Sequence, residues 1–140
     1  MRNTLISLGS VAAILAIAVG TALAHGDVTP QPVDTKGLRD LGKEWVAETP
    51  YRGNETAIKI GASAYAQNCA RCHGIEAISG GIAPDLRYLP EGLEGDEWFQ
   101  TRFRGGSVRD GRVYMPPFEG MLSQEAGWAI RSYLDTRHEN

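Results

Sequence analysis

Both cysteines of this chain lie in one short segment, and that segment limits what the chain can fold around. Cys69 and Cys72 are three residues apart in residues 68–74 (NCARCHG), and His73 follows the second cysteine directly. Four kinds of structure use such a cluster: a disulfide, a dithiol redox site, a zinc site and a covalently attached haem. Each of them makes a different demand on the rest of the chain.

The first three alternatives find little support elsewhere in the sequence. A disulfide between Cys69 and Cys72 closes a very short loop, and it stabilises a fold little because loop-closure entropy grows with loop length. A thioredoxin-like pair belongs to a βαβ unit, and no such pattern is present. A structural zinc ion usually takes two separated ligand pairs, whereas the other histidines, His25 and His138, are far away in sequence.

Covalent attachment of a c-type haem is the interpretation that the motif favours. Its signal is C-x-x-C followed at once by histidine. Residues three apart on a helix lie on one side of it, so Cys69 and Cys72 can bond to neighbouring edges of one flat ring. His73 can then bind the iron as the proximal ligand. Such a histidine needs a partner for its other ring nitrogen, and the backbone carbonyl of Pro84 is a candidate, with an ordinary loop proline as the alternative.

The ligand on the opposite side of the iron decides between functions. The candidates are Met115, Met121, His25 and His138. Met115 is favoured because Pro116 and Pro117 follow it and stiffen the backbone that must present its sulfur, whereas Met121 equally suits a core position beside the last helix. A closed iron mainly passes electrons, so we expect an electron carrier and not an enzyme. An easily displaced Met115 would instead suit a haem peroxidase or a gas-binding protein, which is the alternative.

The N-terminus has the layout of a secretory signal peptide. Residues 1–24 contain a basic start, an apolar run over residues 5–19, and small residues at Ala22 and Ala24. The alternative is an uncleaved membrane anchor, since about 20 apolar residues span a bilayer, but glycines interrupt this run. We expect cleavage after Ala24, a periplasmic protein, and no membrane span after cleavage.

The remaining chain is expected to form an extension over residues 25–53 and one domain over residues 54–140. A short helix at residues 36–47 is the only regular element expected in the extension. The domain should contain helices over residues 55–70 and 96–104 and a last helix that starts at Ser123, with loops between them and no strand pair. The formal net charge of −3 argues against a nucleic-acid partner.

An acidic cluster lies in the middle of the chain, at the expected start of the second helix. Its members are Glu91, Glu94, Asp96 and Glu97. The cluster is either a solvated face with a helix N-terminal turn, where carboxylates are favoured, or a surface that steers a redox partner. The sequence leaves both interpretations open.

Several of these residues together resemble the class I cytochrome c family, over residues 54–137. Gly61 and Tyr65 match the small and aromatic face of the first helix. Ile130 and Tyr133 match the apolar–aromatic pair of the last helix. The resemblance implies an all-α fold in which the two terminal helices cross and long loops surround a covalent haem. It also implies His73 and Met115 as axial ligands and the Pro84 carbonyl as acceptor of the proximal histidine's hydrogen bond.

A narrower resemblance is to the periplasmic cytochromes c that are associated with quinoprotein ethanol dehydrogenases. It rests on the segments AHGDVTPQPVDTKGL, PYRGN, NCARCHGIEAISGGIAPDLR and GDEWF. It implies a PQQ-dependent alcohol dehydrogenase as the electron donor and a terminal oxidase or another cytochrome as the acceptor. The long extension over residues 25–53 departs from minimal class I cytochromes, and its role is open.

Overall fold

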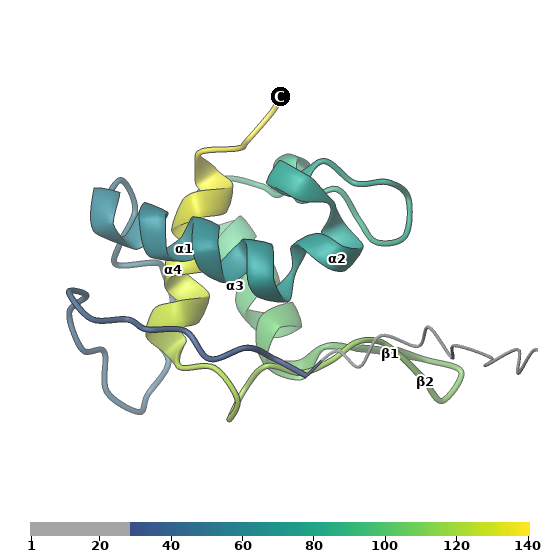
Figure 1. The fold of residues 1–140 in the computed structure, drawn as a ribbon, viewed down its shortest axis with the longest axis horizontal. Helices are drawn as coiled ribbons and strands as arrows, with labels where there is room; N and C mark the ends of the chain where they lie inside the picture. The colour runs from purple at the N-terminus through teal and green to yellow at the C-terminus, as the bar shows by residue number, and fades with distance from the viewer. Residues whose placement is uncertain (1–28) are drawn as a thin grey trace, which may run out of the picture.

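The computed structural model describes residues 29–140, which form a helical domain with one small β-hairpin (Figure 1). The expected signal peptide, its cleavage site and His25 lie outside the described residues. The helical elements are α1 (Glu55–Asn68), α2 (Ala70–His73), α3 (Gly92–Gly105) and α4 (Gln124–Asp135), with single 3-10 turns at Ile75–Ala77 and Leu86–Tyr88. No helix in residues 29–140 is long and apolar enough to cross a membrane.

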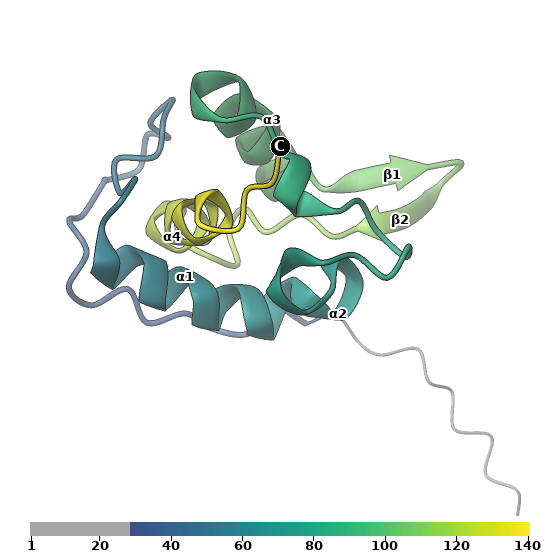
Figure 2. The ribbon, with the colours of Figure 1, turned by 90° about the horizontal axis from the view of Figure 1, so that it is seen from above.

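Helices α1 and α4 pack across each other, as the sequence predicts (Figure 2). Both helices begin at a side-chain cap: Asn54 accepts a hydrogen bond from the backbone of α1, and Ser123 accepts one from the backbone of α4. At the crossing Gly61 is so close to α4 that a Cβ atom on it would lie 1.9 Å from the carbonyl oxygen of Ala129. A glycine is therefore required at this position for the observed helix separation.

The cysteine motif does not continue α1 in a straight line, which differs from the single helix expected over residues 55–70. Helix α1 ends at Asn68, Cys69 caps it, and the rest of the motif forms the separate short helix α2. The backbone N–H groups of Cys72 and His73 both donate to the carbonyl oxygen of Cys69, at 3.1 and 3.0 Å. Cys69 therefore lies at the junction of α1 and α2, and Cys72 lies within α2.

Helix α3 starts earlier than its sequence suggests, at Gly92 and not near residue 96. The glycines in this region point to a loop, but one of them serves packing inside the helix. A Cβ atom on Gly95 would lie 1.7 Å from the carbonyl oxygen of Pro90. Gly95 thus permits a close approach of the helix to the preceding turn.

A β-hairpin follows α3, which contradicts the expectation that the domain has no strand pair. Strands β1 (Ser107–Arg109) and β2 (Arg112–Met115) are antiparallel, with a register irregularity after Ser107. Asp110 and Gly111 form the turn and both have positive φ, 49° and 73°. This is the geometry for which Asp-Gly is strongly preferred in two-residue hairpin loops, so the sequence did carry a signal for the hairpin.

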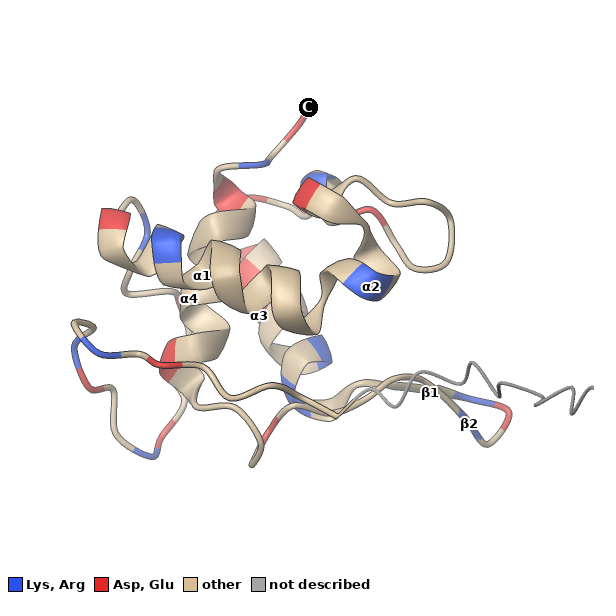
Figure 3. Ribbon diagram, viewed as in Figure 1, with Lys and Arg blue, Asp and Glu red and all other residues tan. Residues whose placement is uncertain are grey.

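The N-terminal extension packs on the domain without forming the short helix expected at residues 36–47. In Figure 3 both acidic and basic residues are marked along its ribbon. Its last part is tied down by Asp96 of α3, whose fully buried carboxylate accepts hydrogen bonds from the backbone of Thr49 at 2.9 Å and from Arg52 at 2.7 Å. Trp45 and Tyr51 of the extension join the hydrophobic core.

The same carboxylate forms a buried ion pair with α4. The Arg131 guanidinium, only 2% exposed, donates from Nε to Asp96 at 2.7 Å. Burying two charges is unfavourable unless they are paired and hydrogen-bonded, and here both conditions are met. Asp96 therefore does not belong to a solvated acidic cluster, because it links the extension, α3 and α4 inside the protein.

Candidate functional site

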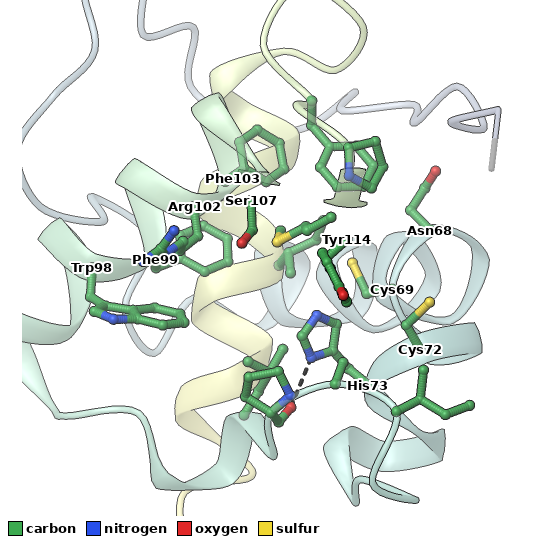
Figure 4. A pocket seen from close by; sticks show the side chains of 18 of the residues that line it. Asn68, Cys69, Cys72, His73, Trp98, Phe99, Arg102, Phe103, Ser107 and Tyr114 are labelled. Atoms are coloured by element: carbon green, nitrogen blue, oxygen red, sulfur yellow. Dashed lines mark hydrogen bonds between the residues drawn. The ribbon is translucent and has the colours of Figure 1, made fainter. Parts of the chain in front are cut away.

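A cavity of ≈ 260 Å³ lies between the cysteine motif, α3, α4 and the hairpin (Figure 4). Cys69, Cys72, His73 and Met115 all line it, so the structure brings together residues from separate parts of the sequence. Most of the remaining wall is apolar and includes Leu86, Phe99, Phe103, Pro116, Phe118 and Ile130. The cavity thus offers sulfur and nitrogen donors within apolar surroundings.

His73 is held in one orientation by a hydrogen bond to the backbone. Its Nδ1–H donates to the carbonyl oxygen of Pro84 at 2.8 Å, which is the dashed line in Figure 4. A carbonyl oxygen can only accept, so a proton is on Nδ1, and in the neutral imidazole Nε2 then keeps its lone pair. The side chain is 9% exposed. A buried, oriented imidazole with an unprotonated Nε2 is the form that binds a metal ion.

The loop that carries Pro84 is anchored by the next residue, Asp85. Its carboxylate accepts hydrogen bonds from the backbone N–H of Ser79 at 3.2 Å and from the Arg87 guanidinium at 3.0 and 2.9 Å. These bonds hold the pKa of Asp85 well below its usual range, so the anchor stays ionised. Sequence reasoning missed Asp85, although an aspartate that caps a turn two residues before an arginine is a local signal.

The two cysteines are not joined in a disulfide. Burial, and then the nearby Cys72, raise the pKa of the Cys69 thiol to about 12, so it is protonated near neutral pH. Within residues 29–140 no three His, Cys, Asp or Glu side chains are grouped so that they could hold a metal ion. The zinc alternative therefore lacks ligands in this part of the chain.

Met115 occupies the end of β2, half-buried in the cavity wall. Gly106 allows the end of α3 to lie close to the backbone of Met115, because its φ is 67° and a Cβ atom there would lie 2.3 Å from the Met115 carbonyl oxygen. Met121 is 49% exposed and does not line the cavity, and neither does His138. Of the described candidates for a second axial ligand, the structure brings only Met115 to the cavity that contains His73.

The residues of the cavity fit a c-type haem. The group is flat and largely apolar, and the walls are aromatic and aliphatic. Two thiols stand beside an imidazole with a free Nε2, and a thioether lies in the same cavity. In addition, the Tyr65 hydroxyl of α1 donates to the Gly74 carbonyl at 2.8 Å and so fastens the end of the motif to the helix before it.

Comparison with known proteins also supports a c-type haem. Residues 56–134 match the family model described as cytochrome c oxidase, cbb3-type, subunit III. The chain is 65% identical to cytochrome c550 of Pseudomonas aeruginosa over 121 residues, which cover 84% of this chain and 83% of that protein. It is 33% identical to cytochrome c6 of Euglena gracilis over 79 residues, which cover 55% of this chain and 88% of the relative.

A third relative is much larger. The chain is 42% identical over 89 residues to quinohemoprotein alcohol dehydrogenase ADH-IIG of Pseudomonas putida, and the match covers 63% of this chain but only 12% of the dehydrogenase. The predicted fold class and cofactor are confirmed by these matches. The chain therefore belongs to the cytochrome c family, and it is an electron carrier with covalently bound haem c.

Proposed function

We propose that this cytochrome accepts electrons from a PQQ-dependent, quinoprotein alcohol dehydrogenase in the periplasm and passes them towards a terminal oxidase or another cytochrome. The observation that carries the choice of donor is the 42% identity to a small part of a quinohemoprotein alcohol dehydrogenase. In that relative the similar segment belongs to the dehydrogenase chain itself. In this protein the corresponding domain would do the same work as a separate carrier.

Within the cavity, each residue of the motif has its own role in the proposal. Cys69 and Cys72 would hold the haem through thioether bonds, and the Nε2 atom of His73 and the sulfur of Met115 would bind its iron. The bound haem supplies the one-electron redox chemistry. The protein contributes the ligand set, and a methionine–histidine pair raises the reduction potential relative to other pairs.

Pro84 and Asp85 act on the site through His73. The Pro84 carbonyl orients the imidazole and makes it a stronger ligand by accepting the hydrogen bond from its Nδ1–H. Asp85 keeps that carbonyl in place by holding the loop through Ser79 and Arg87. The apolar walls keep water away from the ligands, so neither axial side chain competes with solvent for the metal.

The donor is tested by mixing the oxidised cytochrome with purified PQQ-dependent alcohol dehydrogenase and ethanol in a stopped-flow spectrometer. We expect rapid appearance of the reduced c-type spectrum, and none when ethanol is left out. The control is a dehydrogenase sample that is active with an artificial acceptor. If that sample does not reduce the cytochrome, the proposed donor is wrong.

The proposed export is tested separately from the donor. The protein is produced with its full sequence in a bacterium that attaches c-type haem, and the periplasmic fraction is analysed by intact mass and N-terminal sequencing. We expect a chain that begins at His25 and carries one covalent haem. A chain that retains residues 1–24 and stays with the membrane would favour the anchor alternative.

A further inference from the structure

The charged side chains that line the cavity are arginines, although the chain as a whole is negatively charged. Residues 82–84 line the cavity, and so do residues of both strands of the hairpin. The lining contains two arginines, Arg102 and Arg109, and no carboxylate. The whole chain nevertheless has a formal net charge of −3. The charge of the cavity lining is therefore opposite in sign to the net charge.

The hairpin adds a second arginine on the same face as Arg109. Arg109 and Arg112 are paired across the two strands, so their side chains lie on one face of the hairpin, and Tyr114 shares that face because side chains alternate along a strand. The Arg109 guanidinium lies over the Tyr114 ring, 5.7 Å from its centroid. We call Arg109, Arg112 and Tyr114 the hairpin rim.

The arginines of the hairpin rim are exposed and have no ion-pair partner among residues 29–140. Most other described arginines are paired: Arg52, Arg87, Arg104, Arg131 and Arg137 all bind carboxylates. Tyr114 is 62% exposed in spite of its aromatic ring. The rim thus presents two arginines without an ion-pair partner and one large aromatic side chain, with the single carboxylate of Asp110 at the turn between the arginines, on an element that projects from the domain (Figures 1 and 2).

Resting on the proposed function, we propose that the hairpin rim docks an acidic surface of the redox partner beside the haem. Complementary charge of this kind mainly accelerates encounter and fixes orientation. It replaces the acidic cluster as the steering element, because Asp96 is buried and none of Glu91, Glu94 and Glu97 lines the cavity. A cytochrome with a negative net charge then binds a negatively charged partner through the hairpin rim.

A competing role for Arg109 is to neutralise a carboxylate of the haem itself, since Arg109 lines the cavity. Arg112 separates the two roles, because it is exposed and is not part of the cavity lining. If the rim serves docking, Arg112→Gln alone slows the encounter and leaves the reduction potential unchanged. If the arginines only serve the haem, Arg112→Gln has no effect, Arg109→Gln shifts the potential, and the docking proposal is overturned.

The first test needs no protein partner. The reduced cytochrome is oxidised by hexacyanoferrate(III), which takes one electron from the ferrous protein and becomes hexacyanoferrate(II). A net negative protein should repel this anion, so its rate should rise with salt. We expect the opposite, a rate that falls with salt, because screening weakens attraction to the local positive charge.

The matched variants are Arg109→Gln/Arg112→Gln and Lys36→Gln/Lys43→Gln, which remove the same charge from the rim and from the extension. We expect the rim variant to react about tenfold more slowly with the anion at low salt and faster with the cation tris(phenanthroline)cobalt(III). The extension variant should change both rates much less. A wild-type rate that rises with salt, or equal effects of the two variants, would overturn the proposal.

The second test uses the alcohol dehydrogenase as the reductant under the same salt series. The rim variant should be reduced about tenfold more slowly than wild type at low salt and equally fast at high salt. Equal rates for the two proteins at low salt would overturn docking at the rim. If the dehydrogenase reduces neither wild type nor the rim variant, but the hexacyanoferrate rates change as expected, then the proposed donor is wrong and the attraction of anions to the hairpin rim is still supported.

Discussion

Replacing Gly61 by alanine tests whether the helix crossing holds the fold together. Alanine is the better helix former by about 1 kcal/mol, so an isolated α1 would gain from the change. In the protein the added Cβ atom would lie 1.9 Å from the Ala129 carbonyl oxygen and 2.5 Å from its carbon. Both contacts are with backbone atoms, which cannot turn aside as a flexible side chain can.

The size of the effect follows from the space required. Ordinary contacts of a Cβ atom begin near 3.4 Å, so the two backbones must separate by about 1.5 Å along this line. Overpacking of a tight core typically costs about 1–3 kcal/mol, and the separation also loosens the neighbouring Tyr65–Tyr133 contact. We expect Gly61→Ala to lower the free energy of unfolding by about 2 kcal/mol, and Gly61→Val by more.

The assay is equilibrium unfolding of the haem-loaded protein in guanidinium chloride, followed by circular dichroism and by haem absorbance. Gly105→Ala is the matched control, since Gly105 ends α3 and a Cβ atom added there would have nothing within 4 Å of it. We expect this control to leave stability unchanged or to raise it slightly. Equal midpoints for Gly61→Ala and wild type would refute the argument that backbone contact at the crossing requires glycine.

Three further predictions concern other parts of the structure. Met115→Ala should lower the reduction potential and remove the far-red ferric band of a sulfur ligand, whereas Met121→Ala should do neither; the absorption spectrum and a redox titration check this. Asp96→Ala should lower the free energy of unfolding by about 3–5 kcal/mol, because it leaves a buried arginine unpaired. Glu119→Ala, which breaks only a surface pair with Arg104, should cost at most about 1 kcal/mol; denaturant titration of both variants decides. Asp85 has a lower pKa in the folded state than in the unfolded chain, so its ionised carboxylate stabilises the fold above the unfolded pKa of about 3.9, and this stabilisation is lost as pH falls towards the folded pKa. The unfolding midpoint of Asp85→Asn should therefore depend less on pH than that of wild type, which denaturant titrations between pH 2 and 7 check.

The features that the sequence predicts well depend on local chemistry. Helix starts at Asn54 and Ser123 follow from side-chain caps that act within one turn. The haem attachment motif is contiguous, and Met115, which lines the same cavity as His73, could be singled out because the prolines next to it stiffen its own backbone. Gly61 was recognisable because a glycine inside a helix is unfavourable unless something approaches it closely.

The features that were missed depend on partners far away in sequence. Nothing near Asp96 indicates that it pairs with Arg131 and receives the extension, since three segments must first come together. Gly95 looks like a helix breaker until its contact with Pro90 is known. The hairpin is short and exposed, so its strands lack the alternating burial by which strands are usually detected.

The crossing of α1 and α4 has a consequence for how such proteins diversify. Because the first and last helices close the domain on each other, the ends of the segment between them, which contains α2, α3 and the hairpin, are already fixed. Closure entropy rises only slowly with loop length, by about 0.6 kcal/mol for each doubling. Insertions or deletions at the Asp110–Gly111 turn should therefore leave the crossing intact, and the edge that faces other proteins can be remodelled in evolution independently of the scaffold.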